Sequence, residues 1–242
     1  MDTTDFLAAI ERDGAAFAVA CEHAGPAAPV DSCPGWSVAD LLWHLAEVHH
    51  FWATIVGDQR DTWEGYVAPE RPADSELGDF YLAGLGQMLD VLRAAEPTAP
   101  NWTWSSDHSA GFVIRRMAQE TAVHRWDAEH AAGFDWSIDA ELASDGIDEF
   151  LHHFRGDGSG EGEAVGGSVH LHCTDAHGEW MVRPLADGGS DVTREHAKGD
   201  AALRGAASDV LLVLWRRLPL GAIEVIGDEG VAARFVADPS LE

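Results

Sequence analysis

The sequence predicts an α+β protein in which an amino-terminal bundle of four helices is followed by a smaller α+β domain. Three observations support this prediction. The first part repeats apolar residues at helical spacing in segment after segment. The glycine- and acid-rich stretch GDGSGEGEAVGG, residues 156–167, interrupts that pattern and offers few side chains to pack. Beyond it the chain begins with the apolar and polar alternation of a strand. We therefore place the two domains at residues 1–157 and 165–242.

The first domain is expected to contain four main helices and an extra fifth helix. In the first helix, apolar residues such as Phe6 and Ile10 recur at helical spacing. Ser37 is a favourable N-cap for the second helix, and Asp40 three residues later completes a capping box. Gly133 is expected to end the fourth helix. The predicted helices cover residues 4–24, 38–56, 75–95, 112–132 and 139–155.

The second domain is expected to open with a β-hairpin. The segment SVHLHCTD alternates apolar residues with histidines, and EWMVRPL forms its partner strand across the turn DAHG. We interpret His170, His172 and His177 as the solvent-facing side of this hairpin. The α+β prediction is completed by a helix at 208–218, a strand at 223–226 and a helix at 229–236.

The composition excludes several classes of partner. The 242 residues are 46% hydrophobic, yet they contain no run of about 18 uncharged apolar residues, so no membrane span is expected. The chain has 15 basic and 42 acidic residues, a formal net charge of −27. Because this charge repels phosphate groups, we expect no binding to nucleic acid or to a membrane surface. We attribute the charge to solubility or to adaptation to salt.

Cysteine usage and the first residues favour a cytoplasmic location. Cys21, Cys33 and Cys173 form no CxxC pair and are odd in number, as expected of free thiols in a reducing compartment. We expect them to pack rather than to react. The opening stretch MDTTDFLAAIERDG has acids where a secretion signal needs a basic start and an apolar stretch.

The stretch QETAVHRWDAEH, residues 119–130, places polar residues on a helix face that apolar residues also occupy. Glu120 and His124 lie four residues apart in the stripe that contains Val113 and Met117. Because a buried carboxylate without a partner is costly, Glu120 requires a cation, a hydrogen-bond network or a water-filled pocket. Side chains at this spacing can present two ligands to one metal ion. A structural hydrogen bond between the two residues is the alternative.

Residues outside this stretch can complete a metal site. His44 lies at the margin of the apolar stripe of its own helix, and it could supply a third ligand. The resulting His, Glu, His set is that of a catalytic zinc site with one open position. Asp40 lies one turn before His44 and Asp127 one turn after His124, so each could accept the second imidazole N–H. Both acids fit a solvated helix face equally well.

Four blocks of the chain resemble the actinobacterial mycothiol-dependent maleylpyruvate isomerase family. In the order of the family, they are CPGWSVADLLWHLAEVHHFWA, RRMAQETAVHRWDAEHAAG, VHLHCTDAHGEWMVRP and VTREHAKGDAALRGAASDVLLVLWRRLPL. The resemblance implies a DinB-like four-helix bundle followed by a small α+β domain. It also implies a zinc ion held by His44, Glu120 and His124 as the catalytic residues, with mycothiol as the thiol cosubstrate.

The same resemblance implies a reaction in which a metal-activated thiolate adds to an electrophilic small molecule. In an isomerase, mycothiol adds to the cis double bond of maleylpyruvate and leaves after rotation, which gives fumarylpyruvate. A dicarboxylate substrate favours a guanidinium partner, so Arg116 and Arg204 are candidate substrate-binding residues, although both also fit ordinary surface arginines. Two alternatives remain open: a mycothiol S-transferase in detoxification or natural-product assembly, and a non-catalytic zinc- or small-molecule-binding regulator.

Overall fold

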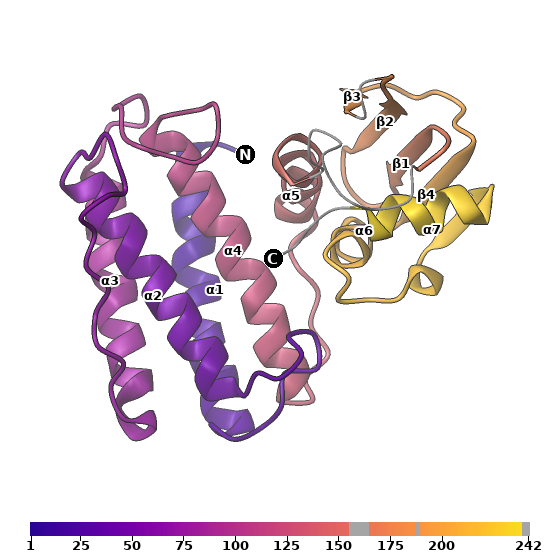
Figure 1. The fold of residues 1–242 in the computed structure, drawn as a ribbon. Coiled ribbons are helices and arrows are strands. Elements are labelled where there is room, and N and C mark those ends of the chain that lie inside the picture. Colours follow the sequence, from indigo (N-terminus) through magenta and orange to yellow (C-terminus); the bar gives the residue numbers. More distant parts are fainter. Residues whose placement is uncertain (155–164, 187–188, 239–242) are drawn as a thin grey trace. The chain divides into compact units, whose positions relative to one another are not determined.

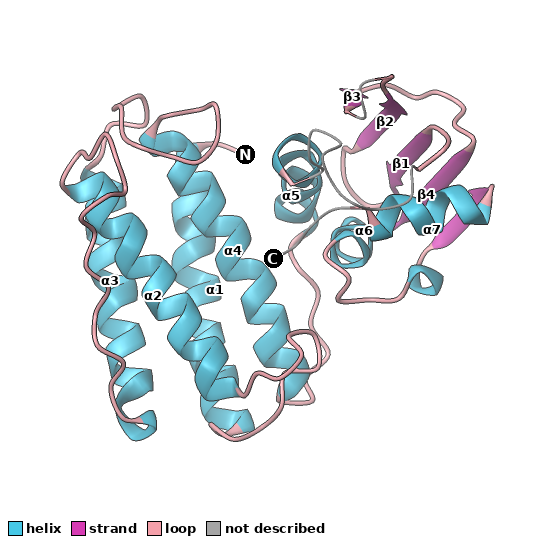
Figure 2. Ribbon diagram, viewed as in Figure 1, coloured by secondary structure: helices cyan, strands magenta, loops and turns pink. Residues whose placement is uncertain are grey.

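The computed structural model describes residues 1–154, 165–186 and 189–238. The chain divides into two compact units, Met1–Trp136 and Ser137–Glu242. The first unit is helical, and the strands of the described residues lie in the second, as Figure 2 shows. The predicted α+β class is therefore confirmed. The division between the units falls earlier than expected, and most of the predicted linker at 156–167 lies outside the described residues.

The first unit is a bundle of four long helices (Figure 1). They are α1 (Thr3–Ala24), α2 (Val38–Gly57), α3 (Leu77–Ala94) and α4 (Ala110–Ala131), with a single 3₁₀ turn, η1 (Asp74–Glu76), before α3. Helix α1 packs mainly against α4, and α2 mainly against α3. The predicted capping box forms at the start of α2, where Ser37 and Asp40 satisfy each other's backbone N–H groups.

Helix α4 buries an unusual set of polar side chains. It packs against both α1 and α2, so more than one of its faces is covered. A buried polar group is stable only with a partner, which makes this helix the place to look for a polar network. Its buried polar residues are Arg116, Gln119, Thr121, His124, Asp127 and Glu129.

The second unit is a five-stranded sheet with helices packed against it. The strand order is β3-β2-β1-β4-β5, with β1 antiparallel to β2 and parallel to β4. The strands are β1 (Val169–Cys173), β2 (Glu179–Pro184), β3 (Ser190–Thr193), β4 (Ala201–Gly205) and β5 (Glu224–Gly227). The helices are α5 (Ala140–His153), α6 (Ala207–Leu214) and α7 (Glu229–Ala237), with a 3₁₀ turn, η2 (Leu220–Ala222), before β5.

Helix α5 belongs to the second unit, which corrects its predicted place in the first domain. The indole N–H of Trp180 on β2 donates to Asp148 of α5 at 3.0 Å. The Ser144 hydroxyl of the same helix donates to the His177 carbonyl at 2.8 Å. The helix also packs against α6. The apolar pattern of α5 showed correctly that the helix has a buried face, but the pattern does not say which unit covers it.

Strands β3 and β4 were not predicted. Strand β4 has the sequence AALRG, in which Ala, Leu and Arg favour a helix. It is nevertheless extended, because it pairs on one side with β1 and on the other with β5. Helix α6 ends at Leu214, before the predicted 218, since Arg216 adopts a left-handed φ of 58°. In β4, tertiary pairing thus overrides the local preference.

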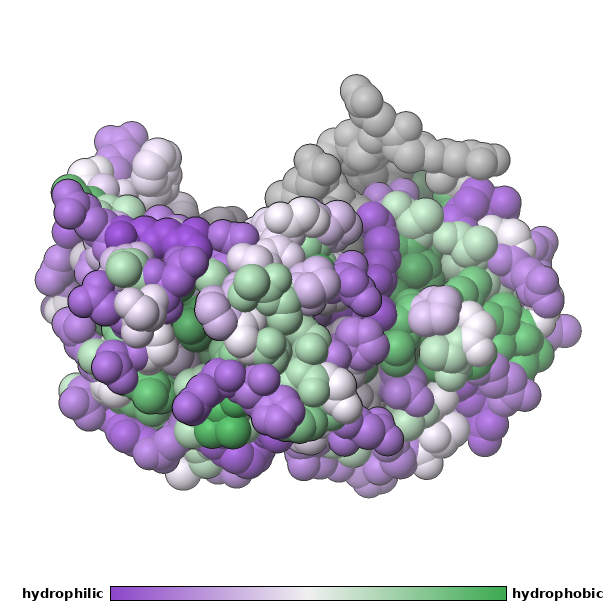
Figure 3. All heavy atoms as spheres, turned by 90° about the horizontal axis from the view of Figure 1, so that it is seen from below, coloured by the Kyte–Doolittle hydropathy of each residue, from purple (hydrophilic) through white to green (hydrophobic). Residues whose placement is uncertain are grey.

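The surface is rich in hydrophilic residues. Figure 3 shows them across the visible face, with smaller hydrophobic patches between them. Exposed large hydrophobic side chains include Val19 and Val67. Among the described helices, none is both long enough and apolar enough to cross a lipid bilayer.

Candidate metal centre

The structure brings His44, Glu120 and His124 together from two helices. His44 lies on α2, and the other two residues lie one turn apart on α4. The Glu120 Oε1 atom is 3.3 Å from Nε2 of His44 and 3.2 Å from Nε2 of His124. The two imidazole rings are nearly perpendicular, with centroids 4.9 Å apart. One carboxylate oxygen is therefore shared by two imidazole nitrogens.

Glu120 is held as a carboxylate by its neighbours. Arg116, one turn earlier on α4, donates to Oε2 at 2.8 Å and thereby fixes the second oxygen. Burial raises the pKa of Glu120, but the charge and hydrogen bond of His124, the hydrogen bond of His44 and the charge of Arg116 outweigh burial. The pKa therefore lies well below its ordinary value, and the group is available as an anionic ligand.

His124 is oriented by Asp127. Its Nδ1 atom donates to Oδ2 of Asp127 at 2.9 Å, which leaves Nε2 facing Glu120. The Asp127 side chain is fully buried, and its other oxygen accepts the Ser32 hydroxyl at 2.6 Å. Burial lowers the pKa of His124, but Glu120 and Asp127 together raise it to about 9. In metal sites, a histidine ligand commonly donates its second ring N–H to a carboxylate in this way, and the contact orients the ring.

His44 faces the surface side of the centre. Its side chain is 33% exposed, whereas that of His124 is 9% exposed. The Trp36 ring packs against the His44 ring with centroids 5.0 Å apart. Trp36 also lines an open pocket of about 410 Å³, together with Asp40 and residues of the loop before α2. Trp36 therefore contacts both His44 and this pocket.

The donor set fits a divalent metal ion. One ligand atom from each of the three residues lies within 4.8 Å of the other two. In a tetrahedral zinc site with bonds of about 2.0–2.1 Å, ligand atoms lie about 3.3 Å apart. The two separations between Glu120 and the histidines, 3.2 and 3.3 Å, match this spacing. Three protein ligands would leave a fourth position open on such an ion.

The structure corrects the expected contact between Asp40 and His44. At the N-terminus of α2, the Asp40 carboxylate turns back to accept from Ser37 and also from Arg71, the latter at 2.8 Å. These hydrogen bonds lower the pKa of Asp40 to about 2. Among the described residues, no hydrogen bond joins Asp40 to His44. The capping geometry occupies the carboxylate, which sequence spacing alone does not reveal.

The two candidate arginines lie in different surroundings. The Arg116 side chain is only 4% exposed and forms an ion pair with Glu120, so it is placed to hold the Glu120 carboxylate in position. Arg204, on β4 of the second unit, is 48% exposed and pairs with Glu224 at 2.8 Å. A contact of Arg204 with substrate stays a prediction.

Two further residues near the centre were not recognised from the sequence. Ser32 supports Asp127, as described above, from a loop whose sequence carries no motif for this role. His49 on α2 is fully buried, with Nε2 3.1 Å from the Thr121 hydroxyl of α4. The burial of His49 depends on how α2 packs against α4, and the residue spacing within α2 alone does not determine that packing.

None of the three cysteines forms a disulfide, as expected, and none is one of the three triad residues. Burial raises the pKa of Cys21 and of Cys173 to about 12, so neither forms a thiolate near neutral pH. Cys33 lies beside the centre, where its Sγ contacts Oδ2 of Asp127 at 3.9 Å.

Comparison with known families identifies the chain. Residues 7–129 match the family described as the mycothiol maleylpyruvate isomerase N-terminal domain. Residues 141–234 match the family described as the MDMPI C-terminal domain. The chain belongs to the mycothiol-dependent maleylpyruvate isomerase family. The resemblance found in the sequence is confirmed, and the second match, like the structure, places α5 with the carboxy-terminal part of an isomerase of this family.

Two solved structures share the isomerase fold with this chain. They are crystal structures of the mycothiol-dependent maleylpyruvate isomerase and of a histidine-to-alanine variant of it. Each superposes with a TM-score of 0.60 at 11% sequence identity, covering 88% of this chain and 88% of the other. At this identity the likeness shows the fold. No curated protein matches the chain.

Proposed function

We propose that the protein is a zinc- and mycothiol-dependent enzyme of the maleylpyruvate isomerase type. The observation that carries the proposal is the placement of Glu120 Oε1 between the Nε2 atoms of His44 and His124. Membership in a family named for mycothiol supports the choice of thiol. Because a thiol cosubstrate must stay reduced, the proposal places the enzyme in the cytoplasm.

The chain's own residues prepare the centre in three ways. His44, Glu120 and His124 would hold the zinc ion, and Arg116 keeps the Glu120 carboxylate in place. Asp127 fixes the tautomer and orientation of His124. Bound zinc would lower the pKa of a coordinated thiol, so that a thiolate would be present at neutral pH. Trp36 and the pocket beside it provide a wall on the exposed side.

The proposed reaction borrows its nucleophile from mycothiol. The thiolate of mycothiol adds to the cis double bond of maleylpyruvate, and the resulting adduct can rotate about what is now a single bond. Expulsion of the same thiolate restores the double bond in the trans form, so fumarylpyruvate leaves and mycothiol is regenerated. Arg204 is proposed as a guanidinium partner for a substrate carboxylate.

The proposal is tested by following both reactants with mass spectrometry. The zinc-loaded protein is incubated with mycothiol and maleylpyruvate, and we expect fumarylpyruvate to form only when mycothiol is present and unchanged in amount. A stable mycothiol conjugate instead would identify an S-transferase. Zinc binding without any turnover of maleylpyruvate or of a panel of electrophiles would identify a non-catalytic regulator.

The ligand assignment has its own test. Glu120→Gln and His124→Ala should each lose zinc and turnover together, because each removes one of three ligands. His130→Ala is the matched control, since His130 is an exposed histidine on the same helix α4. Full zinc retention in both site variants would contradict the assignment.

A further inference from the structure

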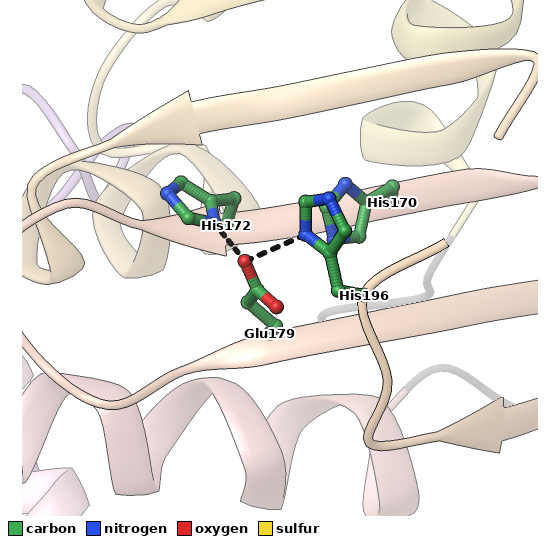
Figure 4. Close-up of side chains that lie close together, drawn as sticks. All are labelled: His170, His172, Glu179 and His196. Atoms are coloured by element: carbon green, nitrogen blue, oxygen red, sulfur yellow. Dashed lines mark hydrogen bonds and ion pairs between the residues drawn. The ribbon is translucent and has the colours of Figure 1, made fainter. Parts of the chain in front are cut away.

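The second unit carries a cluster of three histidines and one glutamate outside the centre described above. His170, His172, Glu179 and His196 each offer a ligand atom, and these atoms lie within 4.8 Å of one another. Figure 4 shows the imidazoles of the three histidines gathered near the Glu179 carboxylate. The proposed function uses none of these residues, so the cluster requires a separate explanation.

Strand geometry places three of the four residues on one face of the sheet. His170 and His172 are two residues apart on β1, so their side chains point to the same face. Glu179 on β2 lies directly across from His172 in the strand register. Val169, Leu171 and Cys173, which alternate with the histidines, are buried on the other face. The two strands thus present three of the four members of the ligand set.

The fourth residue comes from an irregular segment. His196 lies between β3 and β4, and its ring stands perpendicular to that of His170, with centroids 5.2 Å apart. Its Nδ1 atom donates to Oε1 of Glu179 at 3.0 Å. Nδ1 of His172 donates to the same oxygen. One carboxylate oxygen therefore faces two imidazole nitrogens, the same relation as in the first centre.

His170 has a buried nitrogen that lacks a hydrogen-bond partner. His170 is 7% exposed, and Nε2 of its ring is buried with no hydrogen-bond partner among the described residues. This differs from the expected solvent-facing histidine. A buried polar atom left without a partner is costly, and such cases call for an ion or a water to satisfy them.

We propose that His170, His172, Glu179 and His196 form a second metal site, which takes a divalent ion of the zinc class. Three imidazoles and one carboxylate are donors that suit zinc and exclude calcium and magnesium as preferred ions, because those prefer all-oxygen sites. The ion would replace the protons now shared with Glu179 and would give the His170 nitrogen a partner. The side chain of His196 is 77% exposed, so it can move the short distance that tetrahedral coordination requires.

The number of ligands gives this site a role different from that of the first centre. Four protein ligands fill a tetrahedral zinc ion and leave no open position, which is the pattern of structural sites. The ion would fasten the irregular segment containing His196 to strands β1 and β2. An open pocket of about 400 Å³, lined by His172 and Glu179 among others, gives the ion a route from solvent.

The first test counts zinc ions per chain in the full-length protein. After zinc loading and gel filtration, His196→Ala should contain one zinc per chain fewer than the unaltered protein by elemental analysis. His172→Gln should show the same loss. Because the result is a difference, it does not depend on whether the first centre also holds zinc. His152→Ala, which removes an exposed histidine of α5 in the same unit, should lose none.

The second test uses the single lysine of the chain, Lys198, which lies two residues beyond His196. A lysine-specific protease can cut the chain only after this exposed residue. Zinc should slow the cut at least about fivefold in the unaltered protein and not in His196→Ala, because fastening the segment suppresses local opening. Equal zinc content in the unaltered protein, His196→Ala and His172→Gln would overturn the proposal. Zinc-independent cleavage of the unaltered protein would overturn the fastening role.

Discussion

At the scale of single residues, the first centre depends on partners that hold each ligand in one orientation. Glu120 has one oxygen between two histidines and the other on Arg116. His124 has one nitrogen on Glu120 and the other on Asp127. Such partners reduce the number of side-chain conformations open to each residue, so they would strengthen binding of the proposed metal ion without touching it.

Asp127→Asn is expected to weaken zinc binding by about 10- to 100-fold. The amide keeps the shape of the carboxylate but removes its charge, so His124 becomes a weaker ligand. Competition with a chelator of known affinity measures the effect. The His130→Ala variant serves again as the control. An unchanged affinity would mean that Asp127 has only a structural role.

His49 is expected to make stability depend on pH. Burial, with a smaller contribution from His124 and His44, lowers its pKa to about 3 against the opposing charge of Glu120. The unfolded chain takes up this proton near pH 6.5, so stability is full above that value and is lost as the pH falls below it. The loss from this residue is about 2 kcal/mol at about pH 5. Urea unfolding of the unaltered protein and of His49→Gln checks it, since the variant should show the smaller decline with acid.

At the scale of elements, local signals fix some boundaries and tertiary contacts fix others. Helix α2 begins where its capping box predicts, because Ser37 and Asp40 interact within one turn. Strand β4 was missed, because its conformation depends on β1 and β5. The residues of the two proposed metal sites show the same difference between local signals and tertiary contacts. The spacing of Glu120 and His124 is local and was recognised, whereas the burial of His170 depends on His196, which lies in an unpatterned segment.

Ser37→Ala is expected to lower the free energy of unfolding by about 1 kcal/mol. The change removes the hydroxyl that accepts the Asp40 N–H at the start of α2. Equilibrium denaturation in urea measures the loss. Ser75→Ala, at an exposed serine before α3, is the matched control and should have little effect. Equal stability of the two variants would show that this cap contributes nothing.

At the scale of the whole molecule, the net charge of −27 opposes compactness. We expect the melting temperature to rise by several degrees when sodium chloride is raised from about 20 mM to about 500 mM, because salt screens repulsion among the acids. Circular dichroism during heating records it. Potassium chloride should give the same rise if screening is the cause. A constant or falling melting temperature would contradict the expectation.

The assignment of α5 to the second unit has a consequence for synthesis on the ribosome. Every helix of the bundle has been made once Trp136 has emerged, so the bundle can pack while the rest is still being translated. Helix α5 follows at once, but its partners Trp180 and Trp215 are made later. Its apolar face, which includes Phe150, therefore stays uncovered on the nascent chain. The interval before β2 and α6 appear is when this protein most needs a chaperone.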